Sequence, residues 1–266
     1  MPDATAPNGI AALVRRHDPD RFLTALFAPA TQRDALFVLY AFNHELARAR
    51  EAASEPALAL IRLQWWREVV EGARRRHPVA EPLGALLDAG RLDRADLLAV
   101  IDARETEAEP AIETVASWRD YLLGSAGGLA VSAGRLLGAP DPEALRPFGA
   151  AYGAAGVLRS VLALARQGRC LLPAEALAAH GLVPEGVVSE GVSGDSRLHT
   201  VLRNLAGEGR GFLVAGRPGQ VPRRAIAAAL PAVLARRDLA RIPHAQPARG
   251  LGDRLAVTWA GLRGRL

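Results

Sequence analysis

Apolar residues recur at intervals of three and four along most of this chain, the spacing that places side chains on one face of an α-helix. No segment shows a convincing alternation of apolar and polar residues, which is the pattern of a half-buried strand. The composition agrees, because half of the residues are hydrophobic but only 5% are aromatic, and helix-favouring alanine and leucine are abundant. The sequence therefore predicts an all-α protein.

Cap and breaker residues predict where the first helices begin and end. Asp18 followed by Pro19 is typical of a helix start, because the aspartate can cap a helix whose first position is proline. Pro29 is expected to end that helix. Thr31 is then predicted to cap a longer helix, with Asp34 three residues on as in a capping box.

The rest of the chain divides into further helices and one predicted loop. Residues 1–9 are expected to be disordered, and the Gly- and Ser-rich stretch 183–195 is predicted to be a loop. Helices are predicted over residues 57–75, 81–89, 93–106, 112–137, 143–166, 196–215, 222–240 and 251–263. Together these segments predict a bundle of roughly eight to eleven helices.

Charge and hydropathy narrow the class of protein. The net charge is +5, and every basic residue other than histidine is arginine. No basic run is interleaved with aromatic residues, so nucleic-acid binding is not expected, whereas contact between a basic surface and an anionic membrane is favoured. Nothing approaches the run of about 18 apolar residues that spans a bilayer. Charges near the N-terminus follow a short apolar stretch, the reverse of a secretory signal, so the expected location is the cytoplasm, free or peripherally on the inner membrane.

Several motifs occur in an order that resembles the squalene/phytoene synthase family. The stretch 21–47 is similar to the family's opening, in which an arginine and a Tyr-Ala-Phe precede the first aspartate motif, here Arg33 and residues 40–42. Further similarity lies in Trp66-Arg67, in YLLGSAGGLAVSAGRLLG at 121–138 and in YGAAGVLRSVLALARQGRCLLP at 152–173. The resemblance covers about residues 17–180. It implies a single-domain helical bundle of the class I isoprenoid synthase type over residues 10–266.

The family's catalytic residues are missing from the places that the resemblance assigns to them. Its enzymes condense two prenyl diphosphates with Mg²⁺, which Asp-x-x-x-Asp pairs on facing helices bind. In this chain the positions of the first motif fall on Ala47, Arg48 and Glu51, and only Glu51 is acidic. The stretch 157–172, where the second motif belongs, contains no carboxylate. We therefore predict no catalytic residue, no metal ligand and no cofactor, with Mg²⁺ expected only if the chain is an enzyme after all.

Three functions remain open from the sequence. AFNHELA, the Trp-Trp-Arg helix and GVLRS resemble a branch of the family that includes a mitochondrial assembly factor for respiratory complex I and its bacterial relatives. That similarity implies a catalytically inactive assembly or binding factor for a membrane complex. One alternative is a head-to-head prenyl diphosphate synthase with unorthodox metal ligands. Another is a protein that binds an isoprenoid or lipid without catalysis.

One cavity is expected to carry whichever function is correct. The resemblance implies that helices 36–51, 57–75, 112–137 and 143–166 surround it and that their small-residue patches line it. Guanidinium groups could hold an anion there without metal, since arginine pairs readily with phosphates and carboxylates. The candidates for lining the cavity or binding an anion are Tyr40, His44, Arg48, Glu51, Arg159 and Arg169.

A contact with a membrane protein subunit or an anionic membrane surface is also predicted. Trp65 and Trp66 are adjacent and cannot share a helix face, so one is expected in the core and the other is a candidate contact. The basic run 74–76 stands beside them. Arg223-Arg224 and Arg236-Arg237 are further candidates for that contact.

Overall fold

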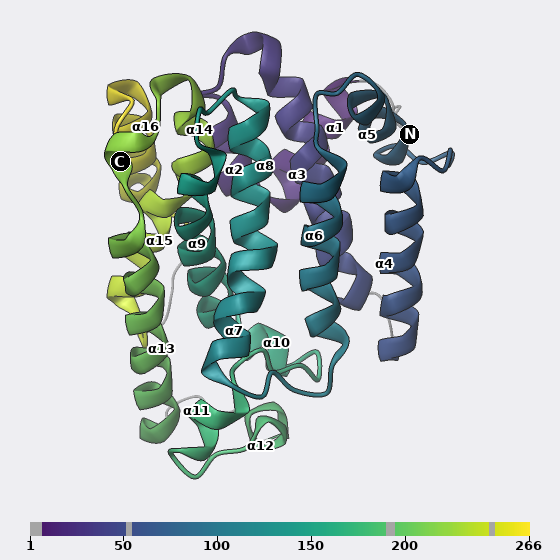
Figure 1. Ribbon diagram of the computed structural model, residues 1–266. Helices are drawn as coiled ribbons and strands as arrows, with labels where there is room; N and C mark the ends of the chain where they lie inside the picture. Colours follow the sequence, from purple (N-terminus) through teal and green to yellow (C-terminus); the bar gives the residue numbers. More distant parts are fainter. Residues whose placement is uncertain (1–6, 52–54, 190–194, 245–247) are drawn as a thin grey trace.

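Long helices run side by side through most of the molecule, as Figure 1 shows for the computed structural model. It describes residues 7–51, 55–189, 195–244 and 248–266. In chain order the helices are α1 (Pro7–His17), α2 (Pro19–Ala25), α3 (Ala30–Glu51), α4 (Pro56–Glu71), α5 (Ala80–Asp88), α6 (Arg94–Glu105), η1 (Thr106–Ala108), α7 (Val115–Leu122), η2 (Leu123–Gly127), α8 (Gly128–Leu136), η3 (Pro142–Leu145), α9 (Arg146–Arg159), α10 (Val161–Ala165), α11 (Ala174–Ala178), α12 (Pro184–Ser189), α13 (Ser196–Ala215), η4 (Pro218–Gln220), η5 (Arg223–Ala225), α14 (Ile226–Ala229), α15 (Pro231–Arg241) and α16 (Leu251–Arg263). Among the described residues, the only β-type pairing is an isolated bridge between Ile112 and Pro173. The all-α prediction is confirmed.

The start of α2 follows the predicted cap, but the start of α3 does not. The Asp18 side chain accepts a hydrogen bond from the Arg21 backbone N–H at 3.1 Å, and Pro19 is the first residue of α2. The Gln32 N–H donates to the Pro29 carbonyl at 2.9 Å, so the first turn of α3 already starts from that carbonyl. Thr31 therefore lies inside α3, and its prediction as the cap is wrong.

Two segments predicted without structure contain helix. Helix α1 begins at Pro7, inside the segment 1–9 that was expected to be disordered, and residues 1–6 lie outside the described part of the chain. Helix α12 occupies Pro184–Ser189 within the predicted loop 183–195. Its Val187 is buried against the core, a contact that outweighs the weak helix propensity of this Gly-containing segment.

The predicted helices 112–137 and 143–166 carry the small-residue patches, at 124–134 and 149–156, and both helices are interrupted. The first is interrupted by the π-helical turn η2, and the second breaks into α9 and α10 at Ser160. The Ser125 hydroxyl within η2 donates to the Tyr121 carbonyl, four residues back. A Cβ placed on Gly149 would lie 2.3 Å from the Ala126 carbonyl oxygen, so α9 can pack on η2 at this distance only with glycine there.

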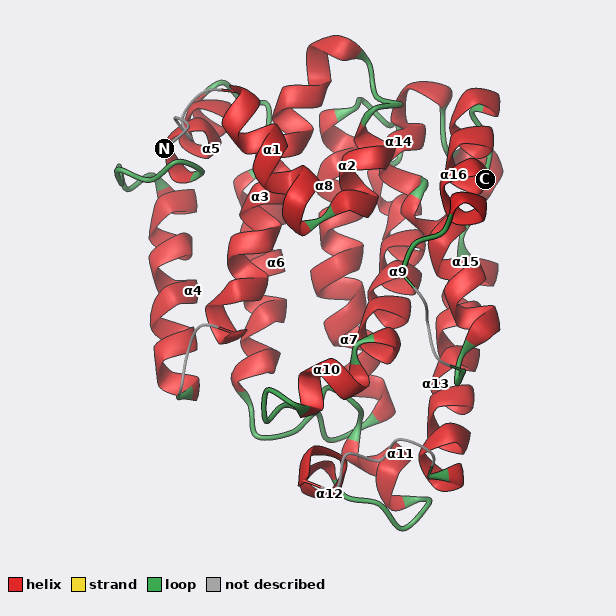
Figure 2. Cartoon of the chain, turned by 180° about the vertical axis from the view of Figure 1, so that it is seen from behind, coloured by secondary structure: helices red, strands yellow, loops and turns green. Residues whose placement is uncertain are grey.

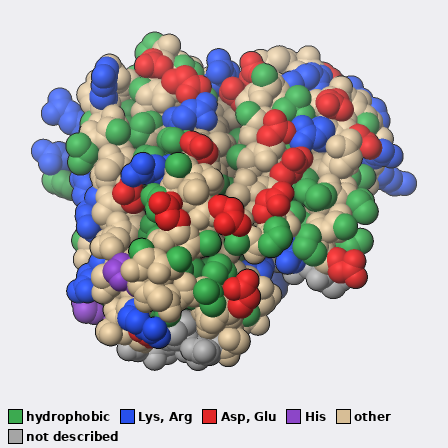
Figure 3. All heavy atoms as spheres, turned by 60° about the horizontal axis from the view of Figure 1, so that its bottom comes forward, with side chains coloured by type: hydrophobic (Ala, Val, Ile, Leu, Met, Phe, Trp, Pro, Cys, Tyr) green, Lys and Arg blue, Asp and Glu red, His purple; other side chains and the backbone are tan. Residues whose placement is uncertain are grey.

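The helices of the bundle are arranged between two lateral edges. Figures 1 and 2 both place α4 at one lateral edge and α13, α15 and α16 at the other, with α3, α6, α8 and α9 between them. Helices α10, α11 and α12 lie together at one end. Figure 3 views that end, where acidic and basic side chains intermingle. Within the described ranges, no helix combines the length and the hydropathy needed to cross a bilayer.

Candidate functional site

A cavity of about 210 Å³ lies in the centre of the bundle. Small residues from facing elements form much of its wall, among them Ala47 of α3, Ser125 of η2 and Gly153 of α9. The other lining residues are Arg21, Arg104, Glu107, Tyr121, Leu122, Ala126, Tyr152, Gly156, Val157, Ser160, Leu164, Arg169 and Leu171. Three of the four segments predicted to surround one cavity, 36–51, 112–137 and 143–166, therefore line it. Helix α4 does not reach it, contrary to the prediction, whereas α2 and α6 do.

One carboxylate with two arginines dominates the polar wall of the central cavity. Glu107 of η1 is 7% exposed and accepts hydrogen bonds from Arg104, from Arg169 at 2.8 Å and from the Tyr121 hydroxyl at 2.8 Å. Burial alone would raise the pKa of Glu107, but the positive charges of Arg104 and Arg169 outweigh it and hold that pKa below its ordinary value. Two guanidinium groups thus surround one ionised carboxylate, and the cluster carries a net positive charge.

The polar wall retains unused hydrogen-bonding capacity. The Nε atoms of Arg104 and Arg169 are buried and have no hydrogen-bond partner among the described residues. Arg104 also donates to the Asn43 side chain at 3.0 Å, which fixes the direction of its guanidinium group. The positive charge of the two guanidinium groups, more than these buried atoms, suits this part of the cavity to a negatively charged group.

A third arginine, Arg21 of α2, reaches the cavity from the other side. Its guanidinium group pairs with Asp18 at 2.8 Å and lies 4.8 Å from the centre of the Tyr152 ring. Tyr40 is buried behind it, with its ring centre 5.8 Å from the guanidinium carbon. Burial raises the pKa of Tyr40, so its hydroxyl stays neutral. The sequence pattern singled out Tyr40 but missed Arg21, whose only signal is its position three residues after the Asp18 cap.

Two of the predicted residues point elsewhere than expected. Arg159 donates to Asp238 of α15 at 3.0 Å, because that carboxylate is only 1% exposed and needs positive partners. Arg48 is half-exposed and pairs with Glu45 at 3.5 Å. Consecutive residues on a helix point about 100° apart, so Ala47, and not Arg48, faces the central cavity.

The remaining candidates divide between the cavity wall, its surroundings and the undescribed part. Arg169 lies in the wall beside Glu107. His44 stacks on His17 with ring centres 4.4 Å apart, and burial with the neighbouring charge of His17 lowers the pKa of His44. Glu51 ends helix α3, and its side chain lies outside the described residues. Binding of an anion by any of them stays a prediction.

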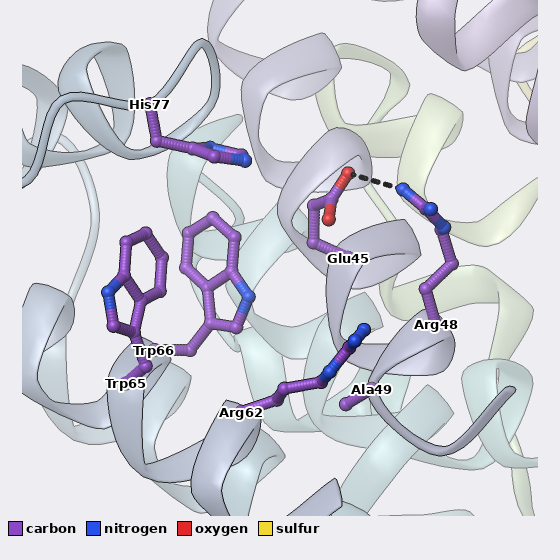
Figure 4. Close-up of a pocket in the computed structure, with 7 residues that line it drawn as sticks. All are labelled: Glu45, Arg48, Ala49, Arg62, Trp65, Trp66 and His77. Atoms are coloured by element: carbon purple, nitrogen blue, oxygen red, sulfur yellow. Dashed lines mark ion pairs between the residues drawn. The ribbon is translucent and has the colours of Figure 1, made fainter. Parts of the chain in front are cut away.

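A second pocket, of about 230 Å³, lies between α3 and α4. Figure 4 shows Trp65 and Trp66 on one side of it and Glu45 with Arg48 on the other. Trp66 is in the core, which confirms that one tryptophan of the pair is buried. Trp65 is half-buried, because its ring packs edge-on against Trp66 and His77. It is therefore a poorer candidate for an exposed contact than its sequence position suggested.

The donor set of the central cavity does not fit the magnesium that the resemblance implies. Mg²⁺ needs several oxygen ligands, usually carboxylates, and the enzymes of this fold present them from facing helices. Glu107 is the only carboxylate in the described wall, and two arginines and a tyrosine already use its oxygens. The rest of the wall includes the apolar residues Ala47, Val157 and Leu164. The described residues contain no group of three or more histidine, cysteine or acidic side chains that could hold a metal ion.

The comparisons with known proteins agree with this architecture. The model of the squalene/phytoene synthase family matches residues 14–260. A dehydrosqualene synthase crystal structure superimposes with a TM-score of 0.77 at 15% identity, covering 97% of this chain and 95% of that one. Squalene synthase HpnC from Alicyclobacillus acidocaldarius gives a TM-score of 0.64 at 19% identity, covering 98% of both chains. At these identities the two structures establish the fold alone.

A curated relative of a different kind matches in sequence. Human NADH dehydrogenase (ubiquinone) complex I, assembly factor 6 is 28% identical over 181 residues, which are 65% of this chain and 54% of the relative. The chain thus spans about half the length of the curated relative it matches. The similarity to an assembly factor was predicted from the degenerate motifs. With a family model that covers most of its length and a fold shared with two synthases, the chain belongs to the squalene/phytoene synthase family.

Proposed function

We propose that this chain is a non-catalytic member of its family that acts as an assembly or binding factor for a membrane complex of the respiratory complex I type. The observation that carries the proposal is the state of Glu107, which two arginines neutralise in a cavity whose described wall has no other carboxylate. Departure of a diphosphate needs metal ions to stabilise the developing negative charge, and this wall offers them no free ligands. Similarity to the human assembly factor supports the assembly role.

The proposed partner is a membrane protein subunit. We expect the chain to contact it at the anionic surface of the membrane, on the cytoplasmic side. A direct test compares a host strain with and without the gene. Without it, native gels of solubilised membranes should contain less assembled NADH dehydrogenase complex, while squalene and carotenoid levels stay unchanged. Restoration of the complex by the wild-type gene completes the test. An unchanged amount of complex, together with loss of a terpenoid, would favour the prenyltransferase alternative.

The central cavity favours a second candidate function, the binding of an anionic isoprenoid or lipid without catalysis. Its wall combines the positively charged Arg104 and Arg169 with apolar and small residues. A volume of about 210 Å³ is below the roughly 300–1,000 Å³ of typical ligand pockets, so the cavity suits a phosphate-bearing head group better than a whole prenyl chain.

Calorimetric titration with pyrophosphate and with farnesyl diphosphate, both without Mg²⁺, tests this second function. Wild-type protein should bind, and Arg169→Met should weaken binding at least about tenfold, since a charge-assisted hydrogen bond to the anion is lost. Arg166→Met on the same loop serves as the matched control, because Arg166 is exposed and does not line the cavity. No binding by the wild type, or equal effects of the two substitutions, would exclude the cavity as the anion site.

A further inference from the structure

Helix α16 presents four large apolar side chains to solvent. Leu251 is 77% exposed, Leu255 66%, Trp259 62% and Leu262 62%. Single exposed leucines are common on protein surfaces, but a row of large apolar residues on one helix marks an interaction surface. We call these four residues the α16 stripe.

The geometry of the helix makes the stripe continuous. Its members follow one another at intervals of four, four and three residues, so they lie within an arc of about 80° around the helix axis. The opposite face is buried, with Val257 and Ala260 in the core. Gly261 packs so closely on the Phe27 ring that an added Cβ would lie 2.4 Å from it. The helix is therefore fixed to the bundle by one face while a second apolar face points outward.

The charges around the stripe are positive. Arg254 and Arg263 are exposed and stand on opposite borders, about 60° and 40° outside the arc. The Arg263 guanidinium lies over the Trp259 ring, 5.1 Å from its centre. The one carboxylate of α16, Asp253, is buried and pairs with Arg237 of α15 at 2.7 Å.

A neighbouring element adds to the same charge. The exposed Arg223 of η5 donates to the Leu262 carbonyl at 3.2 Å, which holds it at the end of the stripe. Arg265 is exposed just beyond the helix. In Figure 3, arginine side chains project at both lateral edges, and the left edge is the side on which Figure 1 draws α13, α15 and α16. The exposed charged residues that border the stripe are thus arginines, and α16 exposes no acidic residue.

We propose that the α16 stripe rests on an anionic lipid bilayer, with its leucines and Trp259 at the interface and the bordering arginines on lipid phosphates. An apolar face that carries tryptophan and leucine between basic residues is the pattern of a helix lying in a membrane surface. Each bordering guanidinium can pair with a phosphate, and an anionic leaflet attracts the group as a whole. An acidic protein surface would suit the same arginines, and the test below treats that as a separate outcome.

The region that the sequence favoured for this contact is less suitable. Arg74 pairs with Asp88 and Arg75 with Glu68, so two charges of the run 74–76 are already neutralised. Trp65 is half-buried against other rings. The exposed tryptophan that meets basic side chains is Trp259, which was not considered from the sequence.

Flotation with lipid vesicles tests the proposal on the full chain. Vesicles of phosphatidylcholine with 30% phosphatidylglycerol should bind the wild-type protein at low salt and release it at high salt, whereas pure phosphatidylcholine should bind it weakly. The double variant L255S/W259S should bind at least about tenfold more weakly, since two apolar side chains lose their place in the interface. Leu58→Ser with Ile61→Ser on α4 is the matched control, because those side chains are similarly exposed, and it should bind within about twofold of the wild type.

Each outcome decides for or against the lipid surface. Melting curves of both double variants should match the wild type, because all four positions are exposed. Absence of wild-type binding at low salt, or equal binding by L255S/W259S, would overturn the proposal. The proposal would also be overturned if the protein does not bind vesicles but forms a dimer, or a complex with a membrane protein subunit, that depends on the stripe. No prenyl diphosphate or complex assembly enters the assay. Its failure would therefore remove the membrane contact but leave the assembly role standing, and failure of the assembly role would leave the membrane contact standing.

Discussion

Removal of the Glu107 charge gives the sharpest test of how the central cavity is held together. Glu107→Gln keeps the size and an acceptor oxygen but leaves Arg104 and Arg169 buried without a counter-ion. Loss of one partner from a buried ion pair costs about 3–5 kcal/mol, which for a chain of this length corresponds to a fall in Tm of about 6 °C or more. Glu105→Gln is the matched control, because Glu105 is 46% exposed and its pair with Arg67 is worth about 1 kcal/mol at most.

The assay is urea and thermal unfolding of both variants at neutral pH, repeated with pyrophosphate. Pyrophosphate should raise the Tm of Glu107→Gln more than that of the wild type, since the cavity then carries two uncompensated positive charges and binding to the native state stabilises it. A Glu107→Gln variant within about 1 kcal/mol of Glu105→Gln would refute the reasoning, because the buried pairs would then contribute no more than a surface pair.

Four further results are expected. Because the folded-state pKa of Glu107 is lowered, its contribution to stability is complete above the unfolded pKa near about 4.3 and is lost as pH falls through the folded pKa. The free energy of unfolding should therefore fall less with decreasing pH in Glu107→Gln than in the wild type. Millimolar Mg²⁺ should raise the Tm no more than matched ionic strength does, and a saturable rise would count against the non-catalytic account. Asp238→Asn should cost about 3–5 kcal/mol in denaturant unfolding, since it leaves two arginines beside a buried site, whereas Arg159→Met should cost clearly less because another arginine still pairs with Asp238. Gly149→Ala should destabilise by about 1–3 kcal/mol through its clash with η2, while Gly156→Ala, which meets nothing within 4 Å, should stabilise by up to about 1 kcal/mol; equal effects would contradict the close packing of α9.

The helical periodicity of the sequence was sufficient to predict the main helices. Helix α13 covers the predicted 196–215 and α16 the predicted 251–263. A helix cap was also predictable where the cap residue bonds to the first turn of the helix that follows it, as Asp18 does. Such features are predictable because they depend on residues a few positions apart.

The site was harder to predict because it depends on helix rotation and on distant partners. A difference of one residue decides that Ala47 faces the cavity and Arg48 does not. Arg159 pairs with Asp238, which is 79 residues away in the sequence, and no local sequence pattern predicts that pair. Glu107 lies in a short turn outside the family motifs, so its central position appears only when three segments of the chain meet.

The apolar face of α16 was overlooked for a related reason. In the sequence its leucines and Trp259 read as one more helix with core residues. Only the folded bundle reveals that Val257 and Ala260 already supply the buried face, which leaves the stripe exposed. Exposure of an apolar residue is a property of the assembled helices, and periodicity alone does not determine it.

A condensation assay tests the central claim most directly. Purified protein is incubated with farnesyl or geranylgeranyl diphosphate and Mg²⁺, beside an active dehydrosqualene synthase as the positive control. The account predicts no squalene, phytoene or cyclopropyl intermediate above the level without enzyme, because the carboxylates on which the metal-dependent reaction relies are absent from the described cavity wall. A Mg²⁺-dependent condensation product that disappears in the Glu107→Gln variant would contradict the claim and establish the chain as an enzyme.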